Sequence, residues 1–579
     1  YCCWILIIPY KHLNMNRKLY MLMLTSIATM QGSATNETVD TLKTYELHDV
    51  TVTSTRAGKH TPMAYSSLDK NQIKKLNHGQ DIPFLLALTP SITTTSDAGN
   101  GIGYTSLKVR GTDPSRINFT ANGIPLNDAE SSQVFFVNMG DFMSSVKDIQ
   151  IQRGVGTSTN GSAAFGATIN MQTDAPSLQS YLNLNVSAGS YGTHKESLRF
   201  GSGLLAGHWS FDGRLSNIGS NGYIDRATSQ LNSYFMQGAY TSDNTLIKLL
   251  TFNGIEKTYM AWDYATKEQM KQHGRRYNPS GEYVDDKGIT RYYSNQTDNY
   301  HQQNYQLIWN QLLGNHFSFS AALHYTAGFG YYEQYMVDQK LAKYGLTTTG
   351  LKSDLIRRKN MRNDFFGGVY ALNYKQNRLE ASLGGAINHY NGRHFGTLIS
   401  VINPVVTNYP DYEYYRNKAE KNENSIYGKV NYELVTGLNV YADLQYRYIT
   451  YRIENPEDKY TASPSIGWRY DERYKFLNPK AGLFWQINAN HALYGSWSLS
   501  HREPVRNDFE GNPDPKPRAE RMNDWELGYK YQAMRFSAGL NLYYMAYKDQ
   551  FVLTGERNAI GEMIHRNVGS SYREGIELQ

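Results

Sequence analysis

The chain has 579 residues, of which 40% are hydrophobic, and a mean hydropathy of −0.57. This length exceeds one ordinary soluble core, and the low hydropathy excludes a membrane protein built from a helical bundle. The 58 basic and 52 acidic residues give a net charge of +6, too weak and too scattered to indicate a nucleic-acid partner. The two cysteines, Cys2 and Cys3, lie at the very start of the chain, so we expect no disulfide in the mature protein.

The first 34 residues have the pattern of a secretion signal. Residues 1–14 contain no methionine, and we expect them to be untranslated upstream or spurious sequence. A basic segment (Asn16–Lys18), a short apolar run (Leu19–Met30) and small residues ending at Ala34 then predict a signal peptide over residues 15–34. The apolar run is too short to span a bilayer, although a membrane-anchoring helix is the alternative.

A small mixed domain is predicted next. Residues 35–53 are polar, as in a flexible tail. Helices are expected over Leu68–Leu76 and from Asp81, a plausible N-cap, to Pro90. Short alternating strands separated by glycine turns follow, so the sequence predicts an α/β domain over residues 54–176.

From Tyr181 onward the hydrophobic pattern has a period of two residues. In the first such segment Leu182, Leu184 and Val186 share one face, and Asn183 and Asn185 lie on the other. The same alternation recurs in segments 208–216, 438–448 and 535–547. Numerous long strands with one apolar and one polar face are typical of a transmembrane barrel, in which every backbone group is paired. We therefore expect an antiparallel transmembrane β-barrel over residues 177–579, with the small domain inside it as a plug.

The connections between strands are of very unequal length. Some hairpins close in a few residues, as at Ser242–Thr245 and Leu312–Asn315. Others are predicted as long loops, over residues 255–302, 329–363 and 390–424. Short turns at one end and long loops at the other favour an outer-membrane barrel over a soluble sandwich.

The number of strands suggests an incomplete barrel. We count roughly fifteen strands, whereas plugged barrels of the transporter class have about 22. The chain stops inside an alternating segment, Gly575–Gln579. We therefore expect a truncation at the C-terminus.

Two motifs in the plug resemble those of the TonB-dependent outer-membrane receptors of Gram-negative bacteria. They are Ser106–Asp128 (SLKVRGTDPSRINFTANGIPLND) and Ile149–Thr173 (IQIQRGVGTSTNGSAAFGATINMQT). Weaker similarity follows in the barrel at Asn478–Gly482, Asp524–Lys530 and Tyr572–Glu577. The resemblance implies an active transporter in the outer membrane that is energised by TonB and its inner-membrane complex.

The resemblance also implies a short TonB-binding segment near the mature N-terminus. The candidate box is Asp49, Val50, Thr51, Val52 and Thr53, an extended β-branched segment that could add to the sheet edge of a partner. The alternative is that these residues form the first strand of the plug.

Ligand-binding residues are expected on the outward loops of the plug. The candidates are Asn100, Tyr104, Asn127, Asp128, Glu130 and Gln133, although the polar ones could equally be ordinary turn residues. Arg110 and Arg153, each before a glycine, are expected to bridge the plug to carboxylates of the barrel wall. Tyrosine-rich segments, such as Tyr331–Tyr335 and Tyr409–Tyr415, offer flat amphipathic surface for a bulky ligand or pack within their own loops.

The cargo is expected to be a ferric siderophore or another iron complex, with a corrinoid or haem as the alternative. Because no nucleophile elbow, HExxH helix or Cys/His metal spacing is present, we expect no catalytic residues, no metal site and no cofactor. A passive porin or an adhesin is the rival from another class. The expected partners are TonB, outer-membrane lipid and a small-molecule ligand, and the receptor is expected to be a monomer.

Overall fold

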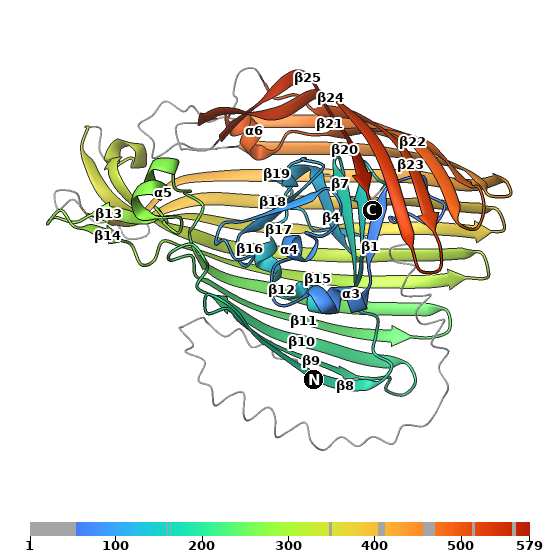
Figure 1. Cartoon of the computed structure of the whole chain (residues 1–579). Coiled ribbons are helices and arrows are strands. Elements are labelled where there is room, and N and C mark those ends of the chain that lie inside the picture. The colour runs from blue at the N-terminus through green and yellow to red at the C-terminus, as the bar shows by residue number, and fades with distance from the viewer. Residues whose placement is uncertain are drawn as a thin grey trace, which may run out of the picture.

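The computed structural model describes residues 54–158, 160–161, 164–346, 350–402, 412–454, 469–511, 516–557 and 563–579. It consists of a small mixed domain and one very large antiparallel sheet that curves around it (Figure 1). We refer to the small domain as the plug and to the large sheet as the wall. The candidate TonB box, Asp49–Thr53, and the predicted signal peptide lie outside the described residues.

The plug is built around a five-stranded sheet with the strand order β1-β6-β7-β4-β5. Strands β4 and β7 are parallel and the other pairs are antiparallel, while β2 and β3 form a separate hairpin. The elements of the plug are β1 (Tyr65–Leu68), α3 (Lys70–Leu76), α4 (Ile82–Leu85), β2 (Ile92–Ser96), β3 (Thr105–Val109), η1 (Pro114–Arg116), β4 (Ile117–Ala121), β5 (Ile124–Pro125), η2 (Phe136–Met139), η3 (Phe142–Ser145), β6 (Val146–Arg153) and β7 (Ala167–Thr173).

The two predicted plug helices differ in how well the sequence located them. Helix α3 begins after Asp69, whose side chain accepts from the backbone N–H of Gln72 while the Gln72 side chain accepts from that of Asp69. This capping box sets the start two residues later than predicted. Helix α4 follows Asp81 as expected but ends at Leu85, well before Pro90, because a tight turn from Leu86 to Thr89 replaces further helix.

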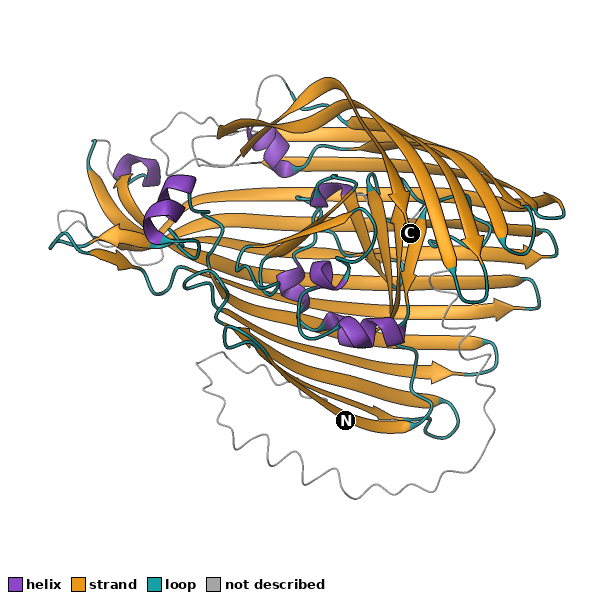
Figure 2. Cartoon of the chain, in the orientation of Figure 1, coloured by secondary structure: helices purple, strands orange, loops and turns teal. Residues whose placement is uncertain are grey.

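Among the described residues the wall contains sixteen strands, each paired with its neighbours in chain order. Figure 2 shows these strands lying side by side around the plug. This confirms the predicted antiparallel sheet, and the count from sequence was one strand short. Among the described strands, β8 pairs only with β9 and β25 only with β24, so the wall has two edges. Its strands are β8 (Ser180–Ala188), β9 (His194–Ser202), β10 (Trp209–Ser220), β11 (Ser229–Thr241), β12 (Thr245–Tyr259), β15 (Thr297–Leu313), β16 (Phe317–Lys340), β17 (Lys352–Gln376), β18 (Leu379–Val401), β19 (Tyr412–Val435), β20 (Leu438–Glu454), β21 (Arg469–Gln486), β22 (His491–Arg502), β23 (Glu520–Gln532), β24 (Ser537–Arg557) and β25 (Met563–Leu578).

The two ends of the wall are different. At one, the short-turn end, neighbouring strands are joined by tight turns such as Ser242–Asn244 and Asn377–Arg378. At the other, the long-loop end, the connections carry further elements (Figure 1). These are α5 (Lys267–His273), β13 (Glu282–Val284), β14 (Thr290–Tyr292), η4 (Leu341–Tyr344) and α6 (Arg506–Gly511).

The outer face of the wall carries an apolar band. Large hydrophobic side chains point away from the plug and are exposed, among them Leu184, Leu323, Ile387, Leu477 and Leu527. Exposed aromatic residues lie beside the short turns, including Trp209, Trp309, Phe317, Tyr432 and Trp485. An apolar band with an aromatic border is typical of a lipid-facing barrel surface.

Two of the three predicted long loops are wrong. Residues 329–340 and 352–363 are paired strand segments of β16 and β17, and residues 390–401 and 412–424 likewise extend β18 and β19. Beyond the apolar band both faces of a strand can be polar, so pairing continues while the alternation disappears. The tyrosines of Tyr331–Tyr335 therefore lie on a strand.

The plug packs against the inside of the wall through an apolar sector. The rings of Phe142 in η3 and Phe252 in β12 have centroids 4.8 Å apart. At Gly254, a Cβ atom would collide with the backbone carbonyl of Asn138 in η2. Other inward residues of β11–β18 join the plug core, namely Phe235, Leu250, Ile308, Ala322, Val369 and Ala386.

Polar contacts hold the plug on either side of this sector. Asp141 of the plug lies 2.5 Å from Nζ of Lys195 on β9. On the other side, the backbone N–H of Ser158 donates to Asp443 on β20 over 2.7 Å. A further apolar cluster joins Val155 and Phe165 of the plug to Met522 and Tyr547 of the wall, so apolar and polar contacts alternate around the plug.

Candidate functional site

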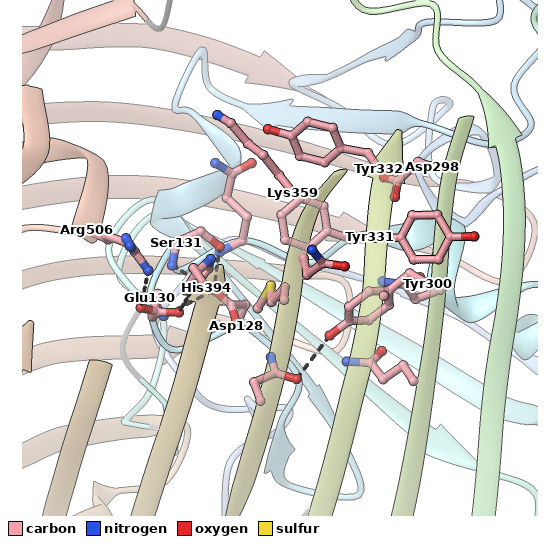
Figure 3. Close-up of a pocket in the computed structure, with 18 of the residues that line it drawn as sticks. Asp128, Glu130, Ser131, Asp298, Tyr300, Tyr331, Tyr332, Lys359, His394 and Arg506 are labelled. Atoms are coloured by element: carbon pink, nitrogen blue, oxygen red, sulfur yellow. Dashed lines mark hydrogen bonds and ion pairs between the residues drawn. The ribbon is translucent and has the colours of Figure 1, made fainter. Parts of the chain in front are cut away.

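A cavity of about 940 Å³ lies between the plug and the parts of the wall nearest the long-loop end (Figure 3). Its floor is the plug segment from Pro125 to Met139, and its walls come mainly from β15–β19 and from α6. Several of the lining side chains are tyrosines: Tyr104, Tyr300, Tyr331, Tyr332, Tyr344, Tyr390, Tyr414 and Tyr415.

The floor is held rigid by its own hydrogen bonds. The Asp128 carboxylate accepts from the backbone N–H groups of Glu130 and Ser131, over 3.1 and 2.8 Å. The Asn127 amide donates to the carbonyls of Ile117 and Ser132 and accepts from the N–H of Phe119. Burial, reinforced by the nearby Glu130 charge, raises the pKa of Asp128. The turn therefore presents a fixed surface to the cavity.

Glu130 connects this floor to the wall. Its carboxylate lies 3.0 Å from Nη1 of Arg506 and 2.6 Å from Nε2 of His394 (Figure 3). It also accepts from the Tyr390 hydroxyl over 2.8 Å. Burial alone would raise the pKa of Glu130, but His394 and Arg506 outweigh it and hold that pKa at about 2. A backbone bond from Arg506 N–H to the Glu130 carbonyl, at 3.0 Å, adds to the attachment.

The opposite wall of the cavity combines cations with aromatic rings. The Arg357 guanidinium donates to Gln334 Oε1 over 2.9 Å and to the Tyr344 hydroxyl over 3.3 Å. Neither partner is acidic, and Lys359 lies near the Tyr332 ring, 5.8 Å from its centroid. This wall is suited to an anionic group on a bulky ligand.

A third side of the cavity is acidic. Glu256 and Asp298 line it, and the Tyr104 hydroxyl donates to Asp298. The Tyr104 ring packs edge-on against Trp262, with centroids 5.0 Å apart. The cavity thus offers both signs of charge and many hydroxyl groups. Among the described residues, no group of three or more His, Cys, Asp or Glu side chains could hold a metal ion.

Comparison with family models is decisive for the class of protein. The model "TonB dependent receptor-like, beta-barrel" matches residues 239–579, and the model "TonB-dependent Receptor Plug Domain" matches residues 57–168. The chain belongs to the TonB-dependent receptor family. Members of this family are outer-membrane β-barrel receptors and transporters, not enzymes; they interact with TonB and bind small-molecule ligands such as ferric siderophores. No curated protein sequence matches the receptor.

Solved structures with the same fold have low sequence identity. The ferric yersiniabactin uptake receptor FyuA from Yersinia pestis has a TM-score of 0.68 and 10% identity, covering 91% of this receptor and 77% of FyuA. The copper transporter OprC has a TM-score of 0.69 and 13% identity, with coverages of 90% and 78%. The unliganded ferric citrate transporter FecA has a TM-score of 0.68 and 13% identity, with coverages of 90% and 74%. At these identities the likeness shows the fold alone.

The receptor brings most of the predicted ligand residues to one place. Asn127, Asp128, Glu130 and Gln133 all line the cavity floor, and Tyr104 lines its acidic side. Asn127 and Glu130 are already engaged by backbone groups and by the wall, respectively. Asn100 is absent from the cavity lining; its amide donates to Ser220 Oγ on β10 over 2.7 Å.

Arg110 and Arg153 both reach carboxylates of the wall. Nη1 of Arg110 lies 2.6 Å from Glu526 Oε1, and its Nε lies 2.9 Å from Glu577 Oε1. Nε of Arg153 lies 3.0 Å from Glu577 Oε2. Gly154 is required here because a Cβ atom would collide with the carboxylates of Asp524 and Glu526.

Several cavity residues escaped the sequence analysis. Arg357 and Lys359 fell within a segment predicted as a loop, and Asp298 and Arg506 had no local signal. The only hint was the high tyrosine content around residue 331. In the part of the receptor that the structure describes, no helix is both long and apolar enough to cross a membrane.

Proposed function

We propose that the receptor binds a ferric siderophore or another bulky iron complex in this cavity and imports it into the periplasm with energy transmitted by TonB. The observation that carries the proposal is the cavity of about 940 Å³ with the plug as its floor. A ligand of drug size or larger fits such a volume. Such a ligand would contact the plug and the wall at once, so its binding would act directly on the plug, which must move during import.

Structural neighbours support an iron complex as the cargo. Besides FyuA and FecA, the ferric-catecholate import receptor Fiu from E. coli K12 has a TM-score of 0.65 and 13% identity. OprC, named as a copper transporter, has an equally similar fold. Because such likeness shows the fold alone, a corrinoid or haem stays the second candidate cargo. A passive porin or an adhesin is disfavoured because the plug packs against the inside of the wall.

Energy coupling would act through the N-terminal tail. We assign the TonB box to Asp49–Thr53 and secretion to a signal peptide over residues 15–34. An extended, β-branched segment suits strand addition to the sheet edge of TonB. The mature receptor would then be a monomer, surrounded by outer-membrane lipid, with its long-loop end towards the outside of the cell.

Growth assays test the cargo. A strain lacking the complete gene is grown with ferric siderophores, ferric citrate, haem or a corrinoid as the only source of the nutrient. We expect a defect on one or more iron complexes that the complete gene restores. A defect confined to haem or to corrinoid would replace the iron complex by the second candidate, and no defect on any source would reject import of these nutrients.

A deletion tests the coupling. Removing Asp49–Thr53 from the complete receptor should leave ligand binding to whole cells unchanged and abolish uptake. Removing Glu37–Thr41, five residues of the same tail, is the matched control and should leave both unchanged. Normal uptake after the first deletion would reject this segment as the TonB box.

A further inference from the structure

Three cations lie side by side on the outer face of the wall, across strands β17, β18 and β19. Arg362 is directly opposite Arg393, and Arg393 is directly opposite Lys418. All three side chains are exposed. Their inward neighbours Met361, His394 and Asn417 line the cavity, which places the cations on the other face of the strands.

Among the described residues, none of these cations forms an ion pair. Lys418 is opposite Glu454 on β20, but the Glu454 carboxylate lies 4.0 Å from Nη1 of Arg469. Asp364, two residues from Arg362 on the same face, accepts from the Tyr325 hydroxyl over 2.7 Å. Glu420, two residues from Lys418 on the same face, is directly opposite Arg452 on β20. Like charges directly opposite each other destabilise a sheet, so an anion bound at this row would stabilise it.

The position of the row suggests where that anion comes from. Phe366, Ile387 and Ile426 are exposed apolar residues of the same three strands, and each lies on the short-turn side of its cation. Arg362 is four residues beyond Phe366, or about 13 Å along the strand. With the usual strand tilt this is about 9 Å above Phe366. The exposed Phe329 of β16 is directly opposite Arg362, so the row lies where the apolar band ends, near the level of lipid headgroups.

We propose that Arg362, Arg393 and Lys418 bind the phosphate groups of an anionic, phosphate-bearing lipid in the leaflet at the long-loop end. The guanidinium groups of Arg362 and Arg393 can each bind a phosphate through paired N–H donors, and the Lys418 ammonium group adds a third positive charge. The acyl chains of the same lipid would lie against the apolar band below. This site is on the opposite face of the strands from the cavity and does not depend on the cargo.

Lipid binding to the purified receptor tests the proposal. The probe is diphosphoryl lipid A, added to the receptor in nonionic micelles and detected by native mass spectrometry. We expect the triple variant R362Q/R393Q/K418Q to bind it roughly 100-fold more weakly, at about fivefold for each cation removed. The control is R452Q, an outward cation on β20 that is already paired with Asp471 at 3.4 Å, and it should bind lipid A normally.

Two further arms identify the lipid phosphate as the partner. Dephosphorylated lipid A should bind to the wild-type receptor no better than diphosphoryl lipid A binds to the triple variant. Inorganic phosphate at the same concentration should produce no shift in melting temperature, whereas diphosphoryl lipid A should raise it. An equal shift with inorganic phosphate would overturn the lipid as the source of the anion.

Folding of the triple variant has its own readout. Because the substitutions remove repulsion between neighbouring strands, the variant should melt in lipid-free micelles at the same temperature as the wild type or higher. Wild-type affinity for lipid A in the triple variant would overturn the proposal. So would a lower melting temperature in lipid-free micelles, because it would show that the three cations stabilise the sheet without a lipid anion.

Discussion

Oε1 of Glu130 lies 3.0 Å from Nη1 of Arg506, although 376 positions separate the two residues in the chain. Glu130 belongs to the plug and Arg506 to α6, in the connection between β22 and β23. The pair is buried and borders the cavity, so it joins the floor of the proposed binding site to the wall.

The first prediction concerns the pH dependence of this attachment. The pKa of Glu130 is about 2 in the folded receptor, below its ordinary value of 4.5. The stabilisation is therefore complete above about pH 4.5 and is lost as the pH falls from there through about 2. Hydrogen exchange of the amides of residues 128–133, corrected for intrinsic rates, should be constant from pH 7 to pH 5 and accelerate below pH 4.5.

The variant E130Q should show faster exchange of the same amides already at pH 7. Breaking one partner of a buried ion pair costs about 3 kcal/mol, or roughly 100-fold in protection. The control E413Q alters a half-exposed pair with Arg416 and should leave these amides unaffected. Wild-type protection in E130Q would show that the remaining contacts suffice to hold the loop.

A second prediction concerns Arg110, whose side chain is fully buried between Glu526 and Glu577. R110Q removes the positive charge that balances these two buried carboxylates, so the plug should lose about 3 to 5 kcal/mol of stability. Hydrogen exchange of β1 and β6 in a urea series measures this loss. K108Q, on the half-exposed pair with Asp113, is the control and should change stability by less than about 0.5 kcal/mol.

A third prediction uses two glycines of the wall. G254A places a methyl group against the carbonyl of Asn138, whereas G428A places one in open space. We expect G254A to displace the plug and to make it sensitive to limited proteolysis, while G428A keeps the wild-type pattern. Equal protease resistance of both variants would contradict the close approach of η2 to β12.

A fourth prediction concerns ligand charge. The Arg357 guanidinium donates to Gln334 and Tyr344, neither of which is acidic. R357Q should therefore weaken the binding of anionic ferric complexes by about tenfold and leave the binding of cationic ones unchanged. Equilibrium binding with ferric complexes of opposite net charge measures this. K352Q, on an exposed pair with Asp338, is the control. An equal loss for both charges would indicate a role for Arg357 in packing alone.

The sequence was most informative where lipid constrains it. In Tyr181–Ala188 and in segment 438–448, every second residue must be apolar because the outer face meets hydrocarbon, and both segments are strands as predicted. In residues 329–340 the exposed Phe329 and Val337 are separated by polar residues without a regular alternation, so nothing in the local pattern separates a strand from a loop.

Only the plug side of the candidate binding site was predictable from the sequence. Asp128 and Glu130 could be chosen because their motif is local, and the structure places both beside the cavity. Arg506 comes from α6 and Arg357 from β17, far along the chain from the plug, and only the fold of the wall brings them near it. No pattern in a single sequence encodes such a pairing.

The uneven contact between plug and wall has a mechanical consequence. The ion pairs Asp141–Lys195 and Arg110–Glu577 are buried, so salt screens them only weakly, whereas the apolar contact of Phe142 with Phe252 weakens on cooling. A pulling force on the plug would therefore meet contacts of different kinds at different strands of the wall, and these contacts would not all break together. The direction of the first opening would be set by the architecture and not by the cargo.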